Sequence, residues 1–168
     1  ANLVVGTVDH EANGFDPLAE YVEGETLDRL LRKGPLPLGR ALTIAIQAGR
    51  RLAAAHEELI VHRDIKPANL MITRHDTVKI LDFGIAKILT DTTSTRDDSL
   101  VGTLSYLAPE QLRNEPTDQR MDIWSLGAVL HEMVTGAAPF GSENVGAVVA
   151  AILSNEPVQL SRTHPDVP

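Results

Sequence analysis

The chain has 168 residues, of which 43% are hydrophobic and 23% charged, and these are the proportions of one ordinary globular domain. Its net charge of -8, with no long basic run, disfavours nucleic acid as a partner, because phosphate binding needs a basic surface. It contains no cysteine and no apolar run long enough to cross a bilayer, so we expect no disulfide, no cysteine-based metal site and no membrane contact within this chain.

The N-terminal part predicts two strands and a short helix. Residues 3–8 and 17–22 are apolar stretches around a turn-like segment, which predicts a hairpin with a proline flaw in its second strand. A short helix is expected over residues 23–34, with Thr26 as its cap and Gly34 as its stop.

The middle of the chain changes period once. Helical spacing from residue 38 to 59 predicts a long amphipathic helix, and its expected apolar face comprises Leu38, Ala41, Leu42, Ala45, Leu52, Ala53 and Leu59. Residues 69–73 and 77–83 predict two short strands joined by a polar turn. Residues 87–102 are polar and aperiodic, which predicts a long loop.

Two more helices are predicted towards the C-terminus. Residues 122–135 are apolar nearly all round, which is typical of a helix buried at the centre of a domain, with Asp122 in its first turn and Gly136 just past its end. Residues 144–155 predict another helix, with one stripe made of Val145, Val148, Val149, Ile152 and Leu153. The elements are mostly helical, with two small hairpins.

The segment "VHRDIKPANLMIT", residues 61–73, sets five polar side chains tightly against an apolar run. Within it "HRDIKPAN" resembles the catalytic loop of protein kinases, and "DFG" at 82–84 and "APE" at 108–110 follow in the family's order. Three such motifs in series are very specific. The lysine of "DIKPAN" and the threonine of "GTLSYLAPE" resemble the Ser/Thr branch of the family. The sequences "VHRDIKPANLMIT" and "DFGIAK" are most similar to those of bacterial eukaryotic-like Ser/Thr kinases.

This resemblance implies an α+β, mainly helical fold: the large, C-terminal lobe of a kinase with a remnant β-hairpin of the small lobe. Residues 1–24 would be the small-lobe strand remnant and hinge, and residues 25–168 the large lobe, incomplete at its C-terminal end. The family's glycine-rich loop and strand lysine have no counterpart here, so we expect the segment alone to have little or no activity. The arginine that usually pairs with Glu110 would lie beyond Pro168.

The implied reaction is transfer of the ATP γ-phosphoryl group to Ser or Thr hydroxyls of proteins. For such a transfer the protein must position the reactants and stabilise the charge on the transferred group. Asp64 is suited to orient the attacking hydroxyl and accept its proton, and Lys66 to offset charge on the phosphoryl group. Asn69 and Asp82 offer the hard oxygen ligands that Mg²⁺ or Mn²⁺ prefers.

The resemblance also assigns a nucleotide pocket, to which Lys66, Asn69 and Asp82 belong. Met71 would lie under the adenine ring, and Ala19 falls at the gatekeeper position. Thr103 would hydrogen-bond near the predicted base and help select Ser or Thr substrates. The hinge, whose backbone groups bind the adenine edge, corresponds to Glu20, Tyr21 and Val22.

Arg63, next to the predicted base, suggests control by phosphorylation. A phosphate on the polar loop would pair with this arginine and order the segment. The candidate acceptors are Thr92, Thr93, Ser94, Thr95 and Ser99. On composition alone, such a loop is more often a solvated linker.

Each singled-out residue also has a structural interpretation. His62 and Phe83 fit packing roles, and Glu110 fits a structural one. Asp122 either anchors the backbone of the catalytic loop or is only a favourable charge at a helix start. The remaining histidines, at positions 10, 56, 75, 131 and 164, show no metal-ligand spacing and default to surface or core.

Two other functions stay open at this point. A pseudokinase or interaction module would keep the fold and bind a partner, but the retained Asp64, Asn69 and Asp82 favour an enzyme. A small-molecule phosphotransferase would not be expected to carry "GTLSYLAPEQL", the segment that docks a peptide. We expect a cytoplasmic domain, with any membrane anchor of the parent protein outside this segment.

Overall fold

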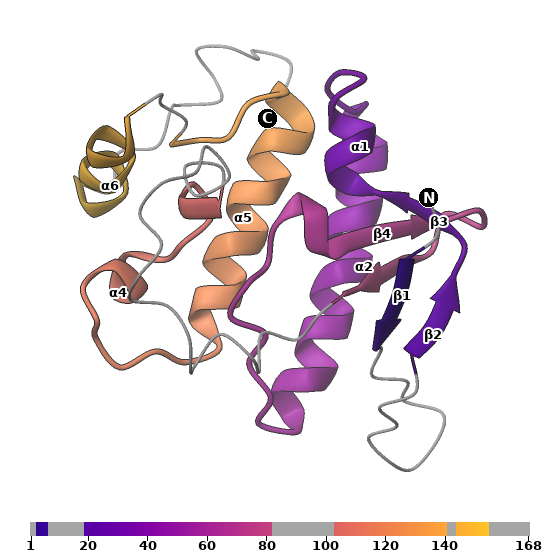
Figure 1. The fold of residues 1–168 in the computed structure, drawn as a ribbon, viewed down its shortest axis with the longest axis horizontal. Coiled ribbons are helices and arrows are strands. Elements are labelled where there is room, and N and C mark those ends of the chain that lie inside the picture. Colours follow the sequence, from indigo (N-terminus) through magenta and orange to yellow (C-terminus); the bar gives the residue numbers. More distant parts are fainter. Residues whose placement is uncertain (1–2, 7–18, 82–102, 141–143, 155–168) are drawn as a thin grey trace.

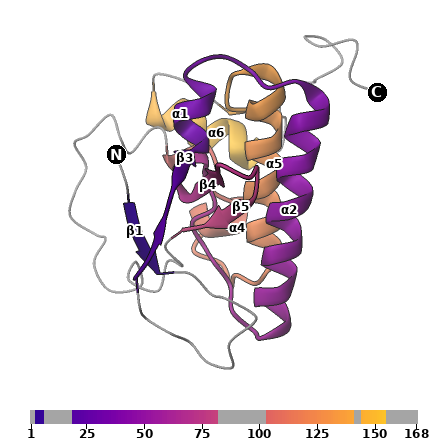
Figure 2. The ribbon, with the colours of Figure 1, turned by 90° about the vertical axis from the view of Figure 1, so that its right-hand side faces the viewer.

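A computed structural model describes residues 3–6, 19–81, 103–140 and 144–154 (Figure 1). Two long helices, α2 (Leu38–Glu57) and α5 (Arg120–Thr135), pack against each other at its centre. In the view of Figure 2, a three-stranded sheet lies between α2 and the strand β1 (Leu3–Gly6). No helix among these residues combines the length and the hydropathy needed to cross a membrane. The mainly helical α+β class predicted from the sequence is confirmed.

Helix α2 begins at the predicted residue and ends two residues earlier than predicted, and its predicted apolar face is only partly correct. The buried residues are Ala41, Ile44, Ala48, Leu52 and Ala55, whereas Leu42 is 42% exposed and Leu59, beyond the helix end, is 91% exposed. The prediction was wrong at Leu42, Ala53 and Leu59 because two adjacent stripes of this helix are apolar. Of the expected face, Ala41 and Leu52 are buried and Leu38 and Ala45 pack against the core, and contact with α5 and the sheet also buries the adjacent residues Ile44, Ala48 and Ala55.

Helix α5 begins two residues earlier than predicted and ends as predicted, at Gly136 in a left-handed conformation with φ 78°. Most of its length lies in the core, with Val129 and Met133 fully buried. The expectation of burial all round is corrected on one side: among the described residues, Ile123 stays 61% exposed and Gly127 is also exposed.

The predicted N-terminal hairpin is confirmed by β1 and β2 (Ala19–Val22), which pair antiparallel in a register that sets Leu3 opposite Val22. The second hairpin is likewise present as β4 (Leu70–Thr73) and β5 (Val78–Ile80).

The segment predicted as one helix over residues 23–34 is instead a strand followed by a helix. Strand β3 (Gly24–Thr26) pairs with β4, and α1 (Leu27–Leu31) follows it directly. Thr26 does occupy the N-cap position, but its side chain makes no capping hydrogen bond there. Gly34 takes a positive φ of 126° just after the helix, as a stop requires.

Pairing with β4 overrode the helical pattern at Gly24, where the two backbones approach very closely. A Cβ atom at this position would lie 2.4 Å from the Ile72 carbonyl oxygen, a distance that no side chain tolerates. Glycine therefore permits the third strand, and the third strand joins the start of α1 to the hairpin that follows the catalytic motif.

A smaller second core lies beyond α5. Helix α6 (Val145–Ser154) buries Val148 and Ile152 against Phe140, and the Phe140 ring stacks on Trp124 with centroids 5.7 Å apart. Val145 is 44% exposed, so the predicted stripe of α6 is only partly buried. A short helix that the sequence did not predict, α4 (Pro109–Leu112), follows the segment beginning at Thr103.

The close approach at Gly24 makes a direct prediction. Gly24→Ala should lower the free energy of unfolding by about 1–3 kcal/mol, because the added methyl group pushes β3 away from β4. Gly39→Ala is the matched control: in α2 an added Cβ meets no described atom within 4 Å, so the change should be neutral or slightly stabilising. Urea unfolding of both variants checks this, and equal stabilities would contradict it.

Candidate active site

The loop between α2 and β4 brings three predicted site residues together. Lys66 Nζ lies 3.0 Å from Asp64 Oδ2, and Asn69 Nδ2 donates hydrogen bonds to the Asp64 carbonyl oxygen (2.7 Å) and to Asp64 Oδ2 (3.1 Å). The Asp64 and Lys66 side chains are only 14% and 20% exposed. A carboxylate, an ammonium group and an amide thus share one small, partly enclosed site.

A rigid frame holds this loop on its C-terminal side. Pro67–Asn69 form a single 3₁₀ turn with proline at its start, where the fixed φ of proline suits a helical turn. The following residues Leu70, Met71 and Ile72 are 0%, 2% and 4% exposed. The prediction that the apolar run "LMI" enters the core is confirmed.

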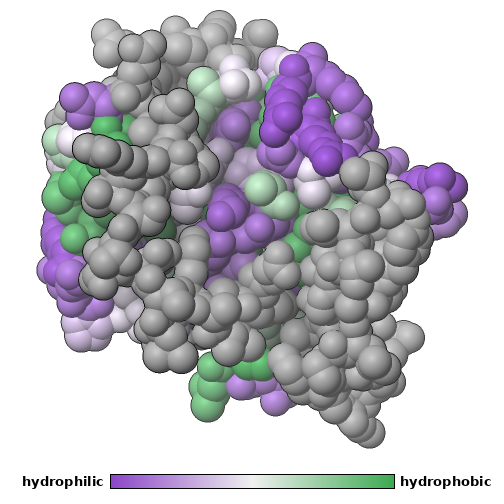
Figure 3. Space-filling view, viewed as in Figure 1, coloured by the Kyte–Doolittle hydropathy of each residue, from purple (hydrophilic) through white to green (hydrophobic). Residues whose placement is uncertain are grey.

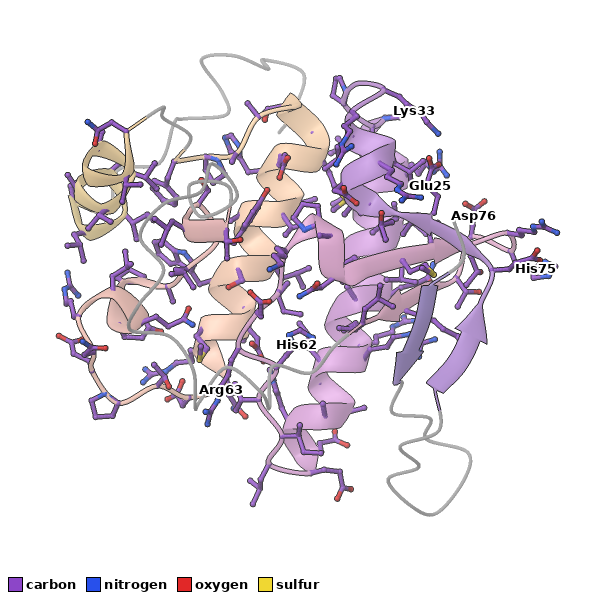
Figure 4. The ribbon with its side chains drawn as sticks, in the orientation of Figure 1. Glu25, Lys33, His62, Arg63, His75 and Asp76 are labelled. Atoms are coloured by element: carbon purple, nitrogen blue, oxygen red, sulfur yellow. The ribbon has the colours of Figure 1, made fainter. Side chains whose placement is uncertain are left out.

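Asp122 of α5 holds the other side of the loop. Its carboxylate is 1% exposed and accepts hydrogen bonds from the backbone N–H groups of His62 (2.9 Å) and Arg63 (2.8 Å). Of the two interpretations of Asp122, the backbone anchor is the one observed. Figure 4 shows His62 and Arg63 at this junction between the two central helices.

His62 is fully buried and connects two parts of the site. Its Nδ1 accepts a hydrogen bond from the Asp64 N–H (3.3 Å), so Nε2 carries the proton and donates it to the Leu81 carbonyl oxygen (3.0 Å). Leu81 directly precedes Asp82 in the sequence. The packing role predicted for His62 therefore includes a hydrogen-bonded link between the catalytic motif and the end of β5.

His56 is a site residue that the sequence did not reveal. Its Nε2 lies 2.8 Å from Asp122 Oδ2, and its side chain is 11% exposed. The sequence predicted only a surface or core role for His56. It did not reveal this contact, because the partner is 66 residues away in the sequence. Its place in the last turn of α2, six residues before His62 of the catalytic motif, was the available signal.

The segment after Thr103 is fastened to α5 at two points. Ser125 Oγ donates a hydrogen bond to the Tyr106 carbonyl oxygen (2.7 Å), and the Tyr106 hydroxyl donates to Glu132 Oε2 at a short distance. Neither Tyr106 nor Glu132 was predicted as a site residue. Together they fix the stretch that the kinase resemblance assigns to peptide docking.

Both groups of this pair have perturbed pKa values. Burial raises the pKa of the Tyr106 phenol, and the hydrogen bond to Glu132 and its charge raise it further. Burial also raises the pKa of Glu132, against the opposing effect of the Tyr106 hydroxyl, and the nearby charge of Asp28 adds to the rise.

Asn69 is suited to hold a metal ion. Both of its amide-hydrogen contacts go to Asp64, and within the described part of the chain no donor reaches its amide oxygen. An oxygen of this kind is a ligand that Mg²⁺ accepts. The described residues contain no group of three His, Cys, Asp or Glu side chains arranged for a metal, and the second predicted ligand, Asp82, lies outside them.

Several predicted residues lie outside the described part of the structure. These are Asp82, Phe83, Thr92, Thr93, Ser94, Thr95 and Ser99. The predicted hinge lies in β2, which contains Ala19 and the hinge residues Glu20, Tyr21 and Val22. Thr103 is partly buried, and Glu110 forms no ion pair with another described residue. Their assigned roles stay predictions.

In Figure 3, hydrophilic residues gather in the middle of the face that carries the catalytic loop, and apolar residues gather over α6 at its edge. In the Asp64, Lys66 and Asn69 cluster, a carboxylate lies beside an ammonium group and an amide. This arrangement can orient a hydroxyl group and accept its proton beside a fixed positive charge.

Comparison with known proteins shows the family. The family model described as "Protein kinase domain" matches residues 11–166. Serine/threonine-protein kinase PknB of Mycolicibacterium smegmatis is 44% identical over 151 residues, covering 88% of this chain and 24% of that protein. A probable serine/threonine-protein kinase of Clostridium perfringens is 39% identical and covers 99% of this chain and 24% of that protein.

A third relative, serine/threonine-protein kinase PknH of Mycobacterium bovis, is 42% identical over 148 residues and covers 88% of this chain and 25% of its own length. The fold, the catalytic loop and these matches define a protein kinase domain. The chain belongs to the protein kinase family, and it is similar to bacterial Ser/Thr kinases. It spans about a quarter of the length of the relatives it matches.

The buried Tyr106–Glu132 pair predicts an alkaline loss of stability. The Tyr106 pKa is raised above its usual 10.0, so the phenol stays neutral in the fold while the unfolded chain ionises. Its contribution is fully present below pH 10 and is lost as the pH rises above that value. Urea unfolding between pH 8 and 11 should therefore show a steeper fall for the unmodified protein than for Tyr106→Phe, and parallel curves would contradict the burial of a neutral phenol.

Proposed function

We propose that the protein is a Ser/Thr protein kinase, which transfers the γ-phosphoryl group of ATP to Ser or Thr hydroxyls of proteins. The observation that carries this proposal is the contact of Asp64 with both Lys66 and Asn69, on a loop whose backbone is held by Asp122. The membership of the kinase family and the similarity to Ser/Thr kinases support the same reaction.

In the proposed reaction, the hydroxyl oxygen of the substrate forms a bond to the γ-phosphorus, and the bond between that phosphorus and the oxygen of ADP breaks. Asp64 accepts a hydrogen bond from the hydroxyl, orients it and takes up its proton. Lys66, 3.0 Å from Asp64, faces the negative charge of the transferred group. Asn69 keeps the Asp64 carboxylate in one orientation through its hydrogen bond.

Asn69 and Asp82 would hold the divalent metal, for which we propose Mg²⁺. When bound, this ion offsets charge on the phosphate oxygens. The Asn69 amide oxygen, to which no donor among the described residues bonds, supports this assignment on the Asn69 side. The His62 hydrogen bond to Leu81 fixes the backbone one residue before Asp82.

The nucleotide would lie against the three-stranded sheet and the β1–β2 pair. Met71 is buried in β4 next to Leu81 and is proposed as the floor of the adenine site. The backbone of Glu20 and Val22 would bind the adenine edge, with Ala19 behind it. Thr103 would hydrogen-bond near the base and favour Ser or Thr as acceptors.

A pseudokinase that binds a partner without catalysis is the second candidate. It would have no use for a carboxylate held between an ammonium group and an amide, so the Asp64 geometry favours the enzyme. We further propose a cytoplasmic domain without nucleic-acid partners, in keeping with the net charge of -8.

The assignment of the base predicts the effect of one substitution. Asp64→Asn in the full-length protein should lower the rate of peptide phosphorylation by about 10²–10⁴-fold, since the proton acceptor is lost while the shape is kept. Stability should change little, because asparagine still offers an oxygen to Lys66. Asp118→Asn, an exposed aspartate paired with Arg120, is the control. Retained turnover of Asp64→Asn would refute the assignment.

Arg63 supports a second prediction, on regulation. It is exposed, takes a left-handed φ of 70°, and is held through its N–H by Asp122, so its backbone is fixed next to the predicted base. We propose that phosphate on Thr92, Thr93, Ser94, Thr95 or Ser99 pairs with Arg63 and orders the loop. Phosphosite mapping of the autophosphorylated full-length protein should find phosphate between residues 82 and 102, and its absence there would remove the proposal.

A further inference from the structure

Gln111 of α4 connects the predicted peptide-docking segment directly to the catalytic loop. It lies near the end of that segment, which runs from Thr103 to Leu112. Its Nε2 donates a hydrogen bond to the carbonyl oxygen of Arg63 (3.4 Å), 48 residues earlier in the chain. In the view of Figure 4, Arg63 lies on the side of His62 that faces α4. A side chain outside the catalytic motif therefore reaches the residue next to the predicted base.

The orientation of the Gln111 amide is set by its second contact. Its Oε1 accepts a hydrogen bond from the partly buried N–H of Ala108 (2.9 Å). A backbone N–H can only donate, so the amide oxygen must face Ala108 and the amide nitrogen must face Arg63. The contact is also one half of a capping box, because Ala108 is the N-cap residue of α4 and Gln111 is the third residue of that helix.

The contact with Ala108 explains how a long and exposed hydrogen bond to Arg63 can hold two segments together. At 3.4 Å the bond is weak, and water competes with it. A free glutamine side chain would also lose rotamer freedom on making it. Here the side chain is already ordered by its bond to Ala108, which is itself fully buried. The second bond therefore adds little further ordering cost.

The Arg63 carbonyl belongs to the peptide group that leads into Asp64. The N–H of this peptide group donates to His62 Nδ1 (3.3 Å), and the N–H of Arg63 donates to Asp122 (2.8 Å). Arg63 has a φ of 70°, so its backbone groups point in directions that a strand or a right-handed helix would not give them. With Gln111 included, each backbone polar group from the Arg63 N–H to the Asp64 N–H has a side-chain partner.

The link to α4 adds something that the contacts within the loop do not provide. Lys66 and Asn69 hold the Asp64 carboxylate, and both belong to the same loop as Asp64. The hydroxyl of a bound substrate would instead be placed by the docking segment. The transfer therefore depends on where the base lies relative to that segment, and Gln111 joins the two directly.

We infer that Gln111 is a positioning residue of the kinase: through the Arg63 carbonyl, it holds the peptide-docking segment at a fixed place relative to Asp64. This inference rests on the proposed function, because it takes Asp64 as the base and the segment from Thr103 to Leu112 as the place where the protein substrate binds. Gln111 would act on transfer to the peptide more than on the use of the nucleotide.

The test compares three variants of the full-length protein. Gln111→Glu keeps an oxygen for the Ala108 N–H and loses the donor to Arg63, whereas Gln111→Lys keeps a donor for Arg63 and loses the acceptor for Ala108. Asn114→Asp is the control for charge. It adds the same negative charge three residues later, at an exposed position where aspartate tolerates the left-handed φ of 53°.

Three quantities are measured for each variant: the thermal midpoint, the rate of phosphoryl transfer to a peptide in a single turnover, and the rate of ATP hydrolysis without peptide. The acceptor is a serine peptide from a library, selected because the unmodified protein phosphorylates it. Hydrolysis takes place at the same nucleotide site, but water needs no docking segment. The ratio of transfer to hydrolysis therefore reports on the link to that segment.

Gln111→Glu should slow transfer to the peptide by about fivefold or more, because a small misplacement of the reacting groups is enough to lower the rate. Its thermal midpoint and its rate of hydrolysis should not change, since the cap of α4 is kept. Gln111→Lys should lower the thermal midpoint and keep transfer within about twofold of the unmodified rate, because the donor to Arg63 is retained. Asn114→Asp should change none of the three quantities.

An unchanged transfer rate in Gln111→Glu would overturn the inference. So would a parallel fall of its transfer rate, hydrolysis rate and thermal midpoint, because Gln111 would then be only a capping residue. Equal slowing in Gln111→Lys or in Asn114→Asp would also overturn it, since the effect would belong to the cap or to the charge. Should Gln111→Lys fail to fold, Gln111→Glu decides through the ratio of transfer to hydrolysis.

These outcomes leave the proposed function intact, because the unmodified protein still phosphorylates the peptide. If the unmodified full-length protein phosphorylates neither protein nor peptide, the proposed function fails, and the role of Gln111 fails with it.

Discussion

The carboxylate of Asp122 is the group on which the site depends. Removing a carboxylate from water costs several kcal/mol unless hydrogen-bond donors replace the water, and here two backbone N–H groups and an imidazole do so. The donors belong to α2 and to the catalytic loop. The hydrogen bonds that stabilise the buried Asp122 carboxylate therefore hold α2, the catalytic loop and α5 together. The hydrogen bond from the Arg63 N–H to Asp122 also maintains the left-handed backbone of Arg63. A residue with a side chain adopts this conformation at a cost of about 1–3 kcal/mol.

The other polar residues of α5 extend this arrangement along the helix. Asp122, Ser125 and Glu132 lie at positions i, i+3 and i+10, which places them on one side of a mainly apolar helix. The first holds the catalytic loop, and the other two hold Tyr106 by its carbonyl oxygen and its hydroxyl. Because one rigid helix carries both attachments, the predicted base and the predicted peptide-docking segment keep a constant separation.

The elements and the chemistry of the site could largely be predicted from the sequence. The long helices follow from period, and "HRDIKPAN" predicted that Asp64, Lys66 and Asn69 form a cluster, since they lie within six residues of one another. The face of α2 could not be predicted, because Leu42 and Ile46 make a second apolar stripe, and only the neighbouring helix selects between them. The strand β3 was missed for a similar reason, since Gly24 and Thr26 pair with residues nearly fifty positions away.

The site residues that the sequence did not reveal have one property in common. His56, Gln111 and Ser125 each direct a polar group at a partner far along the chain, in two cases a backbone atom that any residue would supply. The spacing of residues in the sequence does not indicate a partner that lies far along the chain. A sequence motif indicates only which residues lie close together within one loop.

This difference bears on how a kinase is told from a pseudokinase. The motif residues provide the chemistry, but their distances are set by side chains outside the motif, on helices that pack for other reasons. A chain could keep Asp64, Asn69 and Asp82 and still hold them at the wrong separation. In this protein both anchors of the catalytic loop are present, the Asp122 carboxylate on one side and the buried run after Asn69 on the other. It is this combination, more than the motif alone, that favours an enzyme.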